Sequence, residues 1–410
     1  MAQDPYAALR YPAFRSLIIG NFVITIAQMV QEVAIGYELY RITHDPFSLG
    51  MIGLVEAVPF ISLTLFGGHT ADRYSKRAII IWSVGGVLMS SLILQIAARQ
   101  PEMFSQSLLL VIIYAALFII GICRAFYSPT TTSLRGILVP PPLFENAATW
   151  ASSAWQVGAI LGPVLSGFLY AWLGFANTLV VVTVLVLISL IFYARIGETP
   201  VLPMEKTEGV LSSIGQGIRF VFKTKIILYS ISLDLFSVLF GGVVAILPIY
   251  AMDILKVGSE GLGILRAASS SGAIMTMMLL TRYSPMKKAW RNLLVAVFGF
   301  GASILIFAVS PWMILSVAML FCGGAFDSIS VVIRATILQT MTPDEMRARV
   351  MAVNGIFIAS SNELGAFESG LAAKLLGTVP SAIFGGAMTL LIAGWVYTQS
   401  SDLLKVKIQK

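Results

Sequence analysis

The stretch Gly67–Arg77 reads G-G-H-T-A-D-R-Y-S-K-R and separates two apolar segments, 46–66 and 78–98. Each segment is long enough to cross the ~30 Å hydrocarbon core of a bilayer as a helix. Gly67 and Gly68 allow close backbone approach where the first helix ends. The stretch therefore predicts a short charged loop between two membrane-spanning helices.

This loop resembles the signature of the major facilitator superfamily, in which the connection between helices two and three reads G-x-x-x-D-R-x-G-R-R. Ser75 stands where the second glycine is usual, which stiffens the loop. The alternative is an ordinary basic loop that follows the positive-inside rule. The resemblance implies twelve transmembrane helices in two pseudo-symmetric six-helix bundles, with the loop acting as a gate. The signature positions hold Gly68, Asp72, Arg73, Lys76 and Arg77.

Composition excludes a soluble protein. Hydrophobic residues make up 57% of the 410 residues and charged residues only 11%, whereas soluble domains carry about 25% charged residues. The net charge of +7 is not arranged as a basic stripe with aromatics, so we expect no nucleic-acid partner. Neither a catalytic set nor a metal-ligand cluster is recognisable, so we expect no enzyme, no metal and no cofactor.

Twelve apolar segments are long enough to span a membrane. The polar connection 197–225 separates an N-terminal bundle, 1–196, from a C-terminal bundle, 226–410. Within the connection, 209–223 has the apolar periodicity of an interfacial surface helix without chemistry of its own. The predicted spans are 14–40, 47–69, 78–98, 107–127, 147–172, 176–195, 226–250, 260–282, 292–309, 312–335, 347–373 and 378–399.

The cations predict the orientation. Of 27 Lys and Arg residues, four fall on the outer side and Arg266 falls within a span. The others lie on the inner side, which predicts cytoplasmic termini in a bacterial cytoplasmic (inner) membrane. The four outer cations are Arg41, Arg99, Lys256 and Lys374.

The two halves repeat each other. Duplicated six-helix halves are typical of transporters whose substrate site lies between the halves near mid-membrane. The matching segments are 125–128 with 325–328, Arg135 with Arg334, Pro142 with Pro343, Gly162 with Gly365, Gly167 with Gly370, and Leu173-Gly174 with Leu376-Gly377.

Three further stretches, 11–15, 217–220 and 338–350, resemble the drug and siderophore exporter branch of the superfamily, which contains enterobactin exporters and macrolide efflux pumps. This resemblance implies export of a bulky amphipathic compound driven by the proton gradient.

Helix five carries Gly158-x-x-x-Gly162-Pro163-x-x-x-Gly167. It resembles the glycine–proline motif of facilitator-type antiporters, which implies export. The alternative is a small-residue face that packs closely against another helix in lipid.

Acids inside the predicted spans are the candidate proton and substrate sites, because a charge at mid-bilayer costs at least ~2.5–3.5 kcal/mol. Glu32 is the first candidate and shares a helix stripe with Gln28. Glu56 and Asp234 lie about a third of the way into helices two and seven. Glu38 is nearer the outer end of helix one, where we expect it to face water.

Arg266 is the one cation that we place inside a span. We therefore expect a switchable ion pair of Arg266 with Glu32, Glu56 or Asp234, since exchanging partners shifts a carboxylate's pKa. The alternatives are a fixed structural pair and a side chain that snorkels to water.

Helix eleven adds Glu363 and Glu368, which point roughly 140° apart at about 100° per residue. One is expected to face the transport cavity while the other pairs with a neighbour. Asp327, in the inner part of helix ten, is expected to bond cytoplasmic loops in one conformation, which is a gating role.

These features predict a monomeric secondary transporter that exports a bulky amphipathic organic compound by alternating access in exchange for protons. Its partners are the substrate, protons and the lipid bilayer. Two alternatives remain: a lipid or lysophospholipid transporter of the same fold, and a membrane receptor or scaffold that transports nothing.

Overall fold

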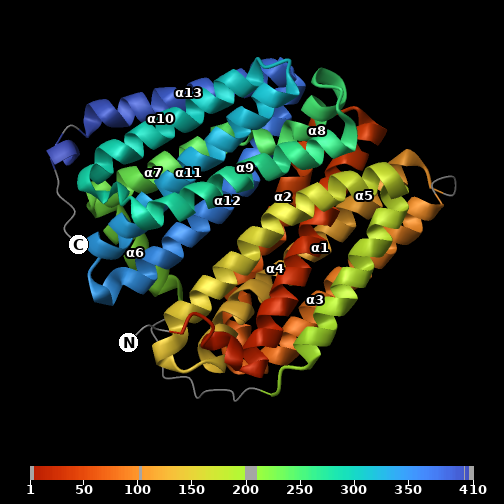
Figure 1. The fold of residues 1–410 in the computed structure, drawn as a ribbon, viewed down its shortest axis with the longest axis horizontal. Coiled ribbons are helices and arrows are strands. Elements are labelled where there is room, and N and C mark those ends of the chain that lie inside the picture. The colour runs from red at the N-terminus through yellow and green to blue at the C-terminus, as the bar shows by residue number, and fades with distance from the viewer. Residues whose placement is uncertain (1–3, 101–103, 199–209, 401, 406–410) are drawn as a thin grey trace. The chain divides into compact units, whose positions relative to one another are not determined.

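The computed structural model describes residues 4–100, 104–198, 210–400 and 402–405, and these residues are almost entirely helical (Figure 1). The α-helices are α1 (Pro12–Thr43), α2 (Pro46–Arg73), α3 (Lys76–Arg99), α4 (Gln106–Leu138), α5 (Phe144–Ala194), α6 (Val210–Lys223), α7 (Lys225–Gly241), α8 (Leu247–Ile249), α9 (Gly258–Arg282), α10 (Ala289–Ala308), α11 (Met313–Met341), α12 (Asp344–Leu376) and α13 (Thr378–Gln399).

Ten helical segments in this described part of the chain are long and apolar enough to cross a membrane. One of them contains α5, which covers both the fifth and sixth predicted spans and bends sharply at Gly174. The eleventh predicted span is α12, which is not among the ten and carries Glu363 and Glu368. The predicted all-helical membrane fold is confirmed.

Two repeated glycines make equivalent connections in the two halves. Gly174 has φ 75° and ψ 174°, and Gly377 has φ 93° and ψ 156°. This backbone region is essentially restricted to glycine. Gly174 separates the two spans of α5, and Gly377 separates α12 from α13, so the repeated Leu-Gly pairs mark the same turn.

Serine hydroxyls cap the N-termini of two helices, α3 and α4. The Ser75 side chain accepts a hydrogen bond from the Ala78 amide at 3.4 Å, and Ser105 accepts one from the Leu108 amide at 3.3 Å. Such caps satisfy amides that lack a partner in the first helical turn. They place the starts of α3 and α4 at the polar loops that the sequence predicts.

The first compact unit comprises 1–43 and 55–206. In it α1 packs mainly on α5, and α3 packs on α4 and α5. Its core is aliphatic, which suits helices buried among other helices. The fully buried members include Leu17, Ile24, Ala27, Val30, Ile80, Val84, Val182 and Val186.

The second unit comprises 44–54 and 207–410, so the first turns of α2 group with it. Here α7 packs on α12 and α13, while α11 packs on α9 and α10. Trp290 is buried in its core, and its indole N–H donates a hydrogen bond to the Ser400 hydroxyl at 2.9 Å. This bond ties the start of α10 to the end of α13.

Helix α7 does not continue through its predicted span. It stops at Gly241, and a 3-10 turn (Val243–Ile246), the short α8 and a π-helical turn (Tyr250–Ile254) complete the segment. Irregular backbone at membrane depth is tolerated where it is buried in protein or lines a cavity. A Cβ built on Gly241 would lie 2.7 Å from Phe300 Cε1 of α10, so the break lies where α7 packs closely on a neighbouring helix.

Glycines also let helices cross at backbone distance in both units. A Cβ built on Gly67 of α2 would lie 2.1 Å from the carbonyl oxygen of Ala125 on α4. In the second unit, a Cβ on Gly272 of α9 would lie 2.0 Å from that of Phe321 on α11. Close packing of this kind replaces the hydrophobic driving force that is missing between helices in lipid.

Candidate functional site

Glu56 of α2 is ion-paired with Arg124 of α4 in the first unit. An Arg124 Nη1 hydrogen donates to Glu56 Oε1, and the guanidinium lies 5.1 Å from the centroid of the Phe60 ring. Gly121 brings the two helices together, because a Cβ there would meet the Glu56 carbonyl oxygen at 2.4 Å. A buried carboxylate is thereby neutralised by a cation on a neighbouring helix.

Asp234 of α7 is ion-paired with Arg334 of α11 in the second unit. Both side chains are only 9% exposed. The Nε–H of Arg334 also donates to the Ser330 carbonyl oxygen at 3.3 Å, which fixes the guanidinium along α11. Among the described residues, each unit thus has a buried carboxylate that is paired with a guanidinium on a neighbouring helix.

The sequence led us to expect Arg266 to pair with Glu32, Glu56 or Asp234, and of these the pairing with Glu32 stays a prediction. Glu56 and Asp234 are held by Arg124 and Arg334, not by Arg266. The two partner arginines had been placed with the cytoplasmic cations, because each falls in the last turn of its predicted span, 107–127 or 312–335. The helices are longer: α4 continues to Leu138 and α11 to Met341.

The remaining predicted polar residues are half-buried, namely Gln28 and Glu32 on α1, Arg266 on α9, and Glu363 and Glu368 on α12. Beside Glu32, the buried Gln31 accepts a hydrogen bond from the Ser91 hydroxyl at 3.0 Å. The Glu363 side chain lies towards the start of α2, with Oε2 3.6 Å from where a Gly53 Cβ would be. These side chains are therefore partly accessible groups in otherwise apolar helices.

Asp327 is also half-buried, two helical turns before Arg334 on α11. Residues two turns apart share one face of a helix. The acid and the arginine therefore follow one another along the same face of α11.

The signature loop is tied to the end of α5 by Arg77. An Nη2 hydrogen of Arg77 donates to the Ala194 carbonyl oxygen at 2.8 Å. Arg73 is exposed and Lys76 is buried, while the Asp72 side chain lies outside the described part of the structure. A cation at the last carbonyls of a helix also interacts favourably with its dipole.

The two glycines that open the loop behave differently. Gly67 is needed for the contact with Ala125, whereas a Cβ on Gly68 would meet nothing within 4 Å. Close helix approach at this point therefore depends on Gly67, and the signature position Gly68 has open space around it.

The helix-five motif faces α1. A Cβ on Gly158 would lie 2.9 Å from Thr25 Cγ2, and one on Gly162 would lie 2.3 Å from Met29 Cβ. Pro163 and Gly167 are buried in the same helix. The motif therefore provides a close helix-packing surface, the role that the sequence left open as an alternative to an antiporter function.

Two polar clusters in the first unit were missed. Glu38 is 6% exposed, so the expectation that it faces water is wrong. It accepts two hydrogen bonds of 2.8 Å from Arg41 and another from the Tyr170 hydroxyl. The three-residue spacing of Glu38 and Arg41 is a helical pairing signal that could have identified this cluster.

The second cluster joins three helices. The hydroxyls of Tyr127 and Tyr193 each donate to Asn21 Oδ1 at 2.9 Å, and they lie 2.7 Å from each other. Tyr127 matches Asp327 in the repeat, so the two units differ in polar chemistry at this position.

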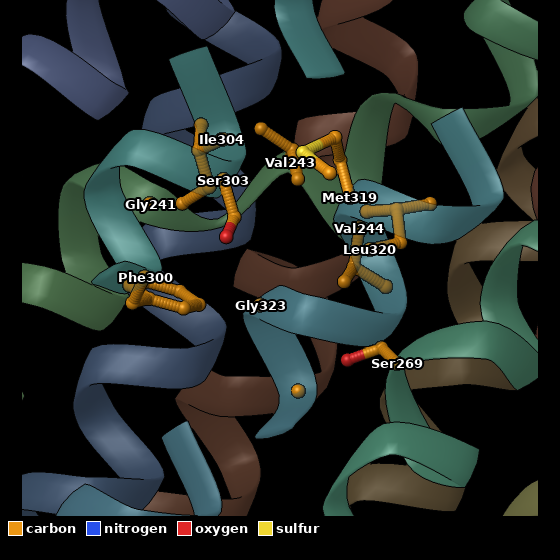
Figure 2. A pocket seen from close by; sticks show the side chains of 11 residues that line it. Gly241, Val243, Val244, Ser269, Phe300, Ser303, Ile304, Met319, Leu320 and Gly323 are labelled. Atoms are coloured by element: carbon orange, nitrogen blue, oxygen red, sulfur yellow. The ribbon is translucent and has the colours of Figure 1, made fainter. Parts of the chain in front are cut away.

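A small cavity of about 60 Å³ lies inside the second unit, where α7 breaks. Figure 2 shows Gly241, Ser303 and Ile304 on one side of it and Val244, Met319 and Leu320 on the other. A drug-sized ligand site usually measures about 300–1,000 Å³. The cavity is therefore too small for a bulky amphipathic substrate.

Comparison with known proteins places this architecture among transporters. The model of the Major Facilitator Superfamily matches residues 17–366. An enterobactin exporter EntS of Shigella flexneri is 25% identical over 396 residues, covering 93% of this chain and 90% of the exporter. An EntS of Salmonella typhi is 24% identical over 401 residues, covering 94% and 93%.

Solved structures share the fold at lower identity. A POT family transporter in complex with 5-aminolevulinic acid has a TM-score of 0.76 and 13% identity, with 96% of each chain covered. At this identity the likeness concerns the arrangement of helices and carries no information on the substrate.

Proposed function

Because the chain belongs to the Major Facilitator Superfamily, we propose that it exports a bulky amphipathic organic compound of the siderophore or drug type in exchange for protons. The chain is a multi-pass membrane transporter rather than an enzyme. The direction of transport, the substrate and the coupling to protons are our proposal. The similarity to enterobactin exporters along almost the whole chain supports the substrate class.

The observation that supports the coupling is the buried carboxylate in each unit that is ion-paired with an arginine of another helix, Glu56–Arg124 and Asp234–Arg334. Carboxylates inside membrane helices are costly, and they typically belong to substrate or ion pathways. A carboxylate that loses its cation in a buried site has its pKa raised and takes up a proton. Exchange of partners between conformations would therefore bind and release protons.

Glu32 remains the proposed proton-linked residue of α1, with Gln28 beside it on the same stripe. Arg266, Glu363 and Glu368 are proposed to bind the substrate or to take part in proton binding, because they are half-buried polar groups in apolar helices. A polar group partly open to water can exchange protons without complete desolvation.

On the cytoplasmic side, Asp72, Arg73 and Arg77 are proposed to stabilise the outward-open state and to lose their contacts when the inner gate opens. Asp327 is proposed to assist by bonding cytoplasmic loops. The hydrogen bond of Arg77 with Ala194 supports a structural tie at this end of the first unit. We further propose a monomer in a bacterial inner membrane, with both termini in the cytoplasm and transport by alternating access.

Reconstituted vesicles test this function. Purified protein is placed in vesicles with an imposed pH gradient, and accumulation of enterobactin, erythromycin or lysophosphatidylcholine is followed. We expect Glu32→Gln to abolish gradient-driven accumulation while the protein stays folded. Glu145→Gln, which changes an exposed acid at the start of α5, is the matched control and should transport normally.

Other outcomes would identify other functions. Movement of the lysolipid alone, without pH dependence, would favour a lipid transporter of the same fold. Failure of every solute to move would favour a receptor or scaffold. Normal gradient-driven transport by Glu32→Gln would remove Glu32 from the mechanism.

A further inference from the structure

Helix α6 presents two different faces along its described residues. Val221 is 1% exposed and Gly217 is buried, whereas Ile218 is 39% exposed and Phe222 is 62% exposed. At about 100° per residue, the exposed positions form one continuous arc. The exposed positions are Gly215, Ile218, Arg219, Phe222 and Lys223.

The buried face of α6 is anchored on α12 (Figure 1). An Nη1 hydrogen of Arg349 donates to Gln216 Oε1. A Cβ on Gly217 would lie 2.9 Å from the Arg349 carbonyl oxygen, so the two helices approach at backbone distance. The orientation of α6 is therefore fixed, and the exposed arc is a defined surface.

That arc is divided lengthwise by chemistry. Ile218 and Phe222 are one turn apart and form an apolar edge, while Arg219 and Lys223 are one turn apart and form a cationic edge. Helices with this division lie in the membrane interface, with the apolar side among acyl chains and the cations at the headgroups.

We propose that this arc of α6 binds anionic phospholipid headgroups, with Arg219 and Lys223 contacting phosphates and Ile218 and Phe222 entering the acyl boundary. Thr224 alone separates α6 from Lys225, the first residue of a membrane span, so the arc lies at the depth of the headgroups. Charge complementarity selects anionic over zwitterionic lipid, because clustered basic residues beside a span attract negatively charged headgroups.

Because α6 contacts α12, lipid bound to α6 would affect a helix that carries proposed transport residues. Lipid binding to α6 would further stabilise the contacts of Gln216 and Gly217 with Arg349 in the first turns of α12. Because α12 also carries Glu363 and Glu368, lipid composition would influence a helix with proposed transport residues. The lipid site itself is independent of what the protein transports.

The test uses the full-length protein in mixed micelles titrated with phosphatidylglycerol or phosphatidylcholine, with thermal unfolding as the readout. We expect phosphatidylglycerol to stabilise the wild type more strongly. Arg219→Gln/Lys223→Gln should raise the midpoint of that titration at least fivefold. The control Lys287→Gln/Lys288→Gln removes two exposed cations elsewhere and should leave the midpoint within twofold.

A second readout reports insertion directly. Phe222→Cys is labelled with a polarity-sensitive fluorophore in a background where Cys123 and Cys322 are replaced by alanine. In nanodiscs containing phosphatidylglycerol, we expect a blue shift that Arg219→Gln/Lys223→Gln reduces. Equal midpoints for the two double variants, or a label that responds to an acidic peptide but not to lipid, would overturn the proposal.

Discussion

The carboxylate of Asp234 on α7 is ion-paired with the guanidinium of Arg334 on α11, and neither side chain is more than 9% exposed. The two residues lie far apart in sequence and come from helices that pack in the same unit. Such a pair joins two helices. A conformational change that separated the partners would leave a buried charge without its counter-ion.

Removing one partner of this pair should be more damaging than removing both. Asp234→Asn leaves the Arg334 charge buried, which typically costs about 3–5 kcal/mol. Asp234→Asn/Arg334→Gln removes both charges and should recover most of that loss. Thermal unfolding of the purified protein measures both effects.

The exposed pair Lys225–Asp402 provides the control, since its nitrogen and oxygen lie 3.0 Å apart at the surface. Surface pairs contribute about 0–1 kcal/mol, so Lys225→Gln/Asp402→Asn should hardly change the melting temperature. An Asp234→Asn protein as stable as the wild type would contradict the importance of the buried pair.

The Glu56–Arg124 pair should depend on the shape of the cation as well as on its charge. Arg124 both donates to Glu56 and stacks near Phe60. Lysine keeps the charge but loses the planar geometry, so Arg124→Lys should lower the initial transport rate about tenfold. Phe60→Leu removes a cation–π contact of about 0.5–1 kcal/mol and should have a smaller effect. Equal rates for Arg124→Lys and the wild type would contradict this role.

The two glycines of the signature loop offer a matched pair of substitutions. Gly67→Ala forces a methyl group against the Ala125 carbonyl and should destabilise the protein by about 1–3 kcal/mol, as overpacking does. Gly68→Ala enters open space and should be nearly neutral. Thermal unfolding distinguishes them, and similar losses for both would show that the α2–α4 crossing is looser than described.

Arg77 should hold the end of α5 in place. Arg77→Gln removes a charge-assisted hydrogen bond to the Ala194 carbonyl and an interaction with the helix dipole worth about 0.3–1 kcal/mol. Hydrogen–deuterium exchange at 190–196 should rise severalfold. The exposed neighbour Arg73 is the control, because Arg73→Gln should leave exchange there unchanged. No change with Arg77→Gln would mean that the contact has no stabilising effect.

Much of the fold was predictable because its signals are local. Apolar length locates the spans, and the repeated Leu-Gly pairs locate Gly174 and Gly377, whose backbone angles only glycine adopts readily. The break in α7 was not predicted, since Gly241 and Gly242 lie within an apolar run that is as hydrophobic as its neighbours. Whether such a run continues as helix is decided by tertiary packing.

The candidate site was predictable in residue type but not in pairing. Glu56 and Asp234 stand out as acids in apolar segments, yet their partners come from other helices and depend on how those helices cross. Arg124 and Arg334 were assigned to the aqueous side because they fall in the last turn of a predicted span, whereas α4 and α11 continue well beyond them. Glu38 was misplaced for a related reason: a buried hydroxyl from Tyr170 and a neighbouring Arg41 satisfy it.

Proton-coupled export is tested most directly by enterobactin uptake into vesicles whose lumen is more acidic than the medium, with and without a protonophore. In protein molecules whose cytoplasmic side faces the medium, outward proton flow should drive the compound into the lumen. We expect accumulation that collapses when the gradient is dissipated and that is lost in Glu32→Gln. Accumulation of equal size without a gradient, or none under any gradient, would contradict proton-driven export.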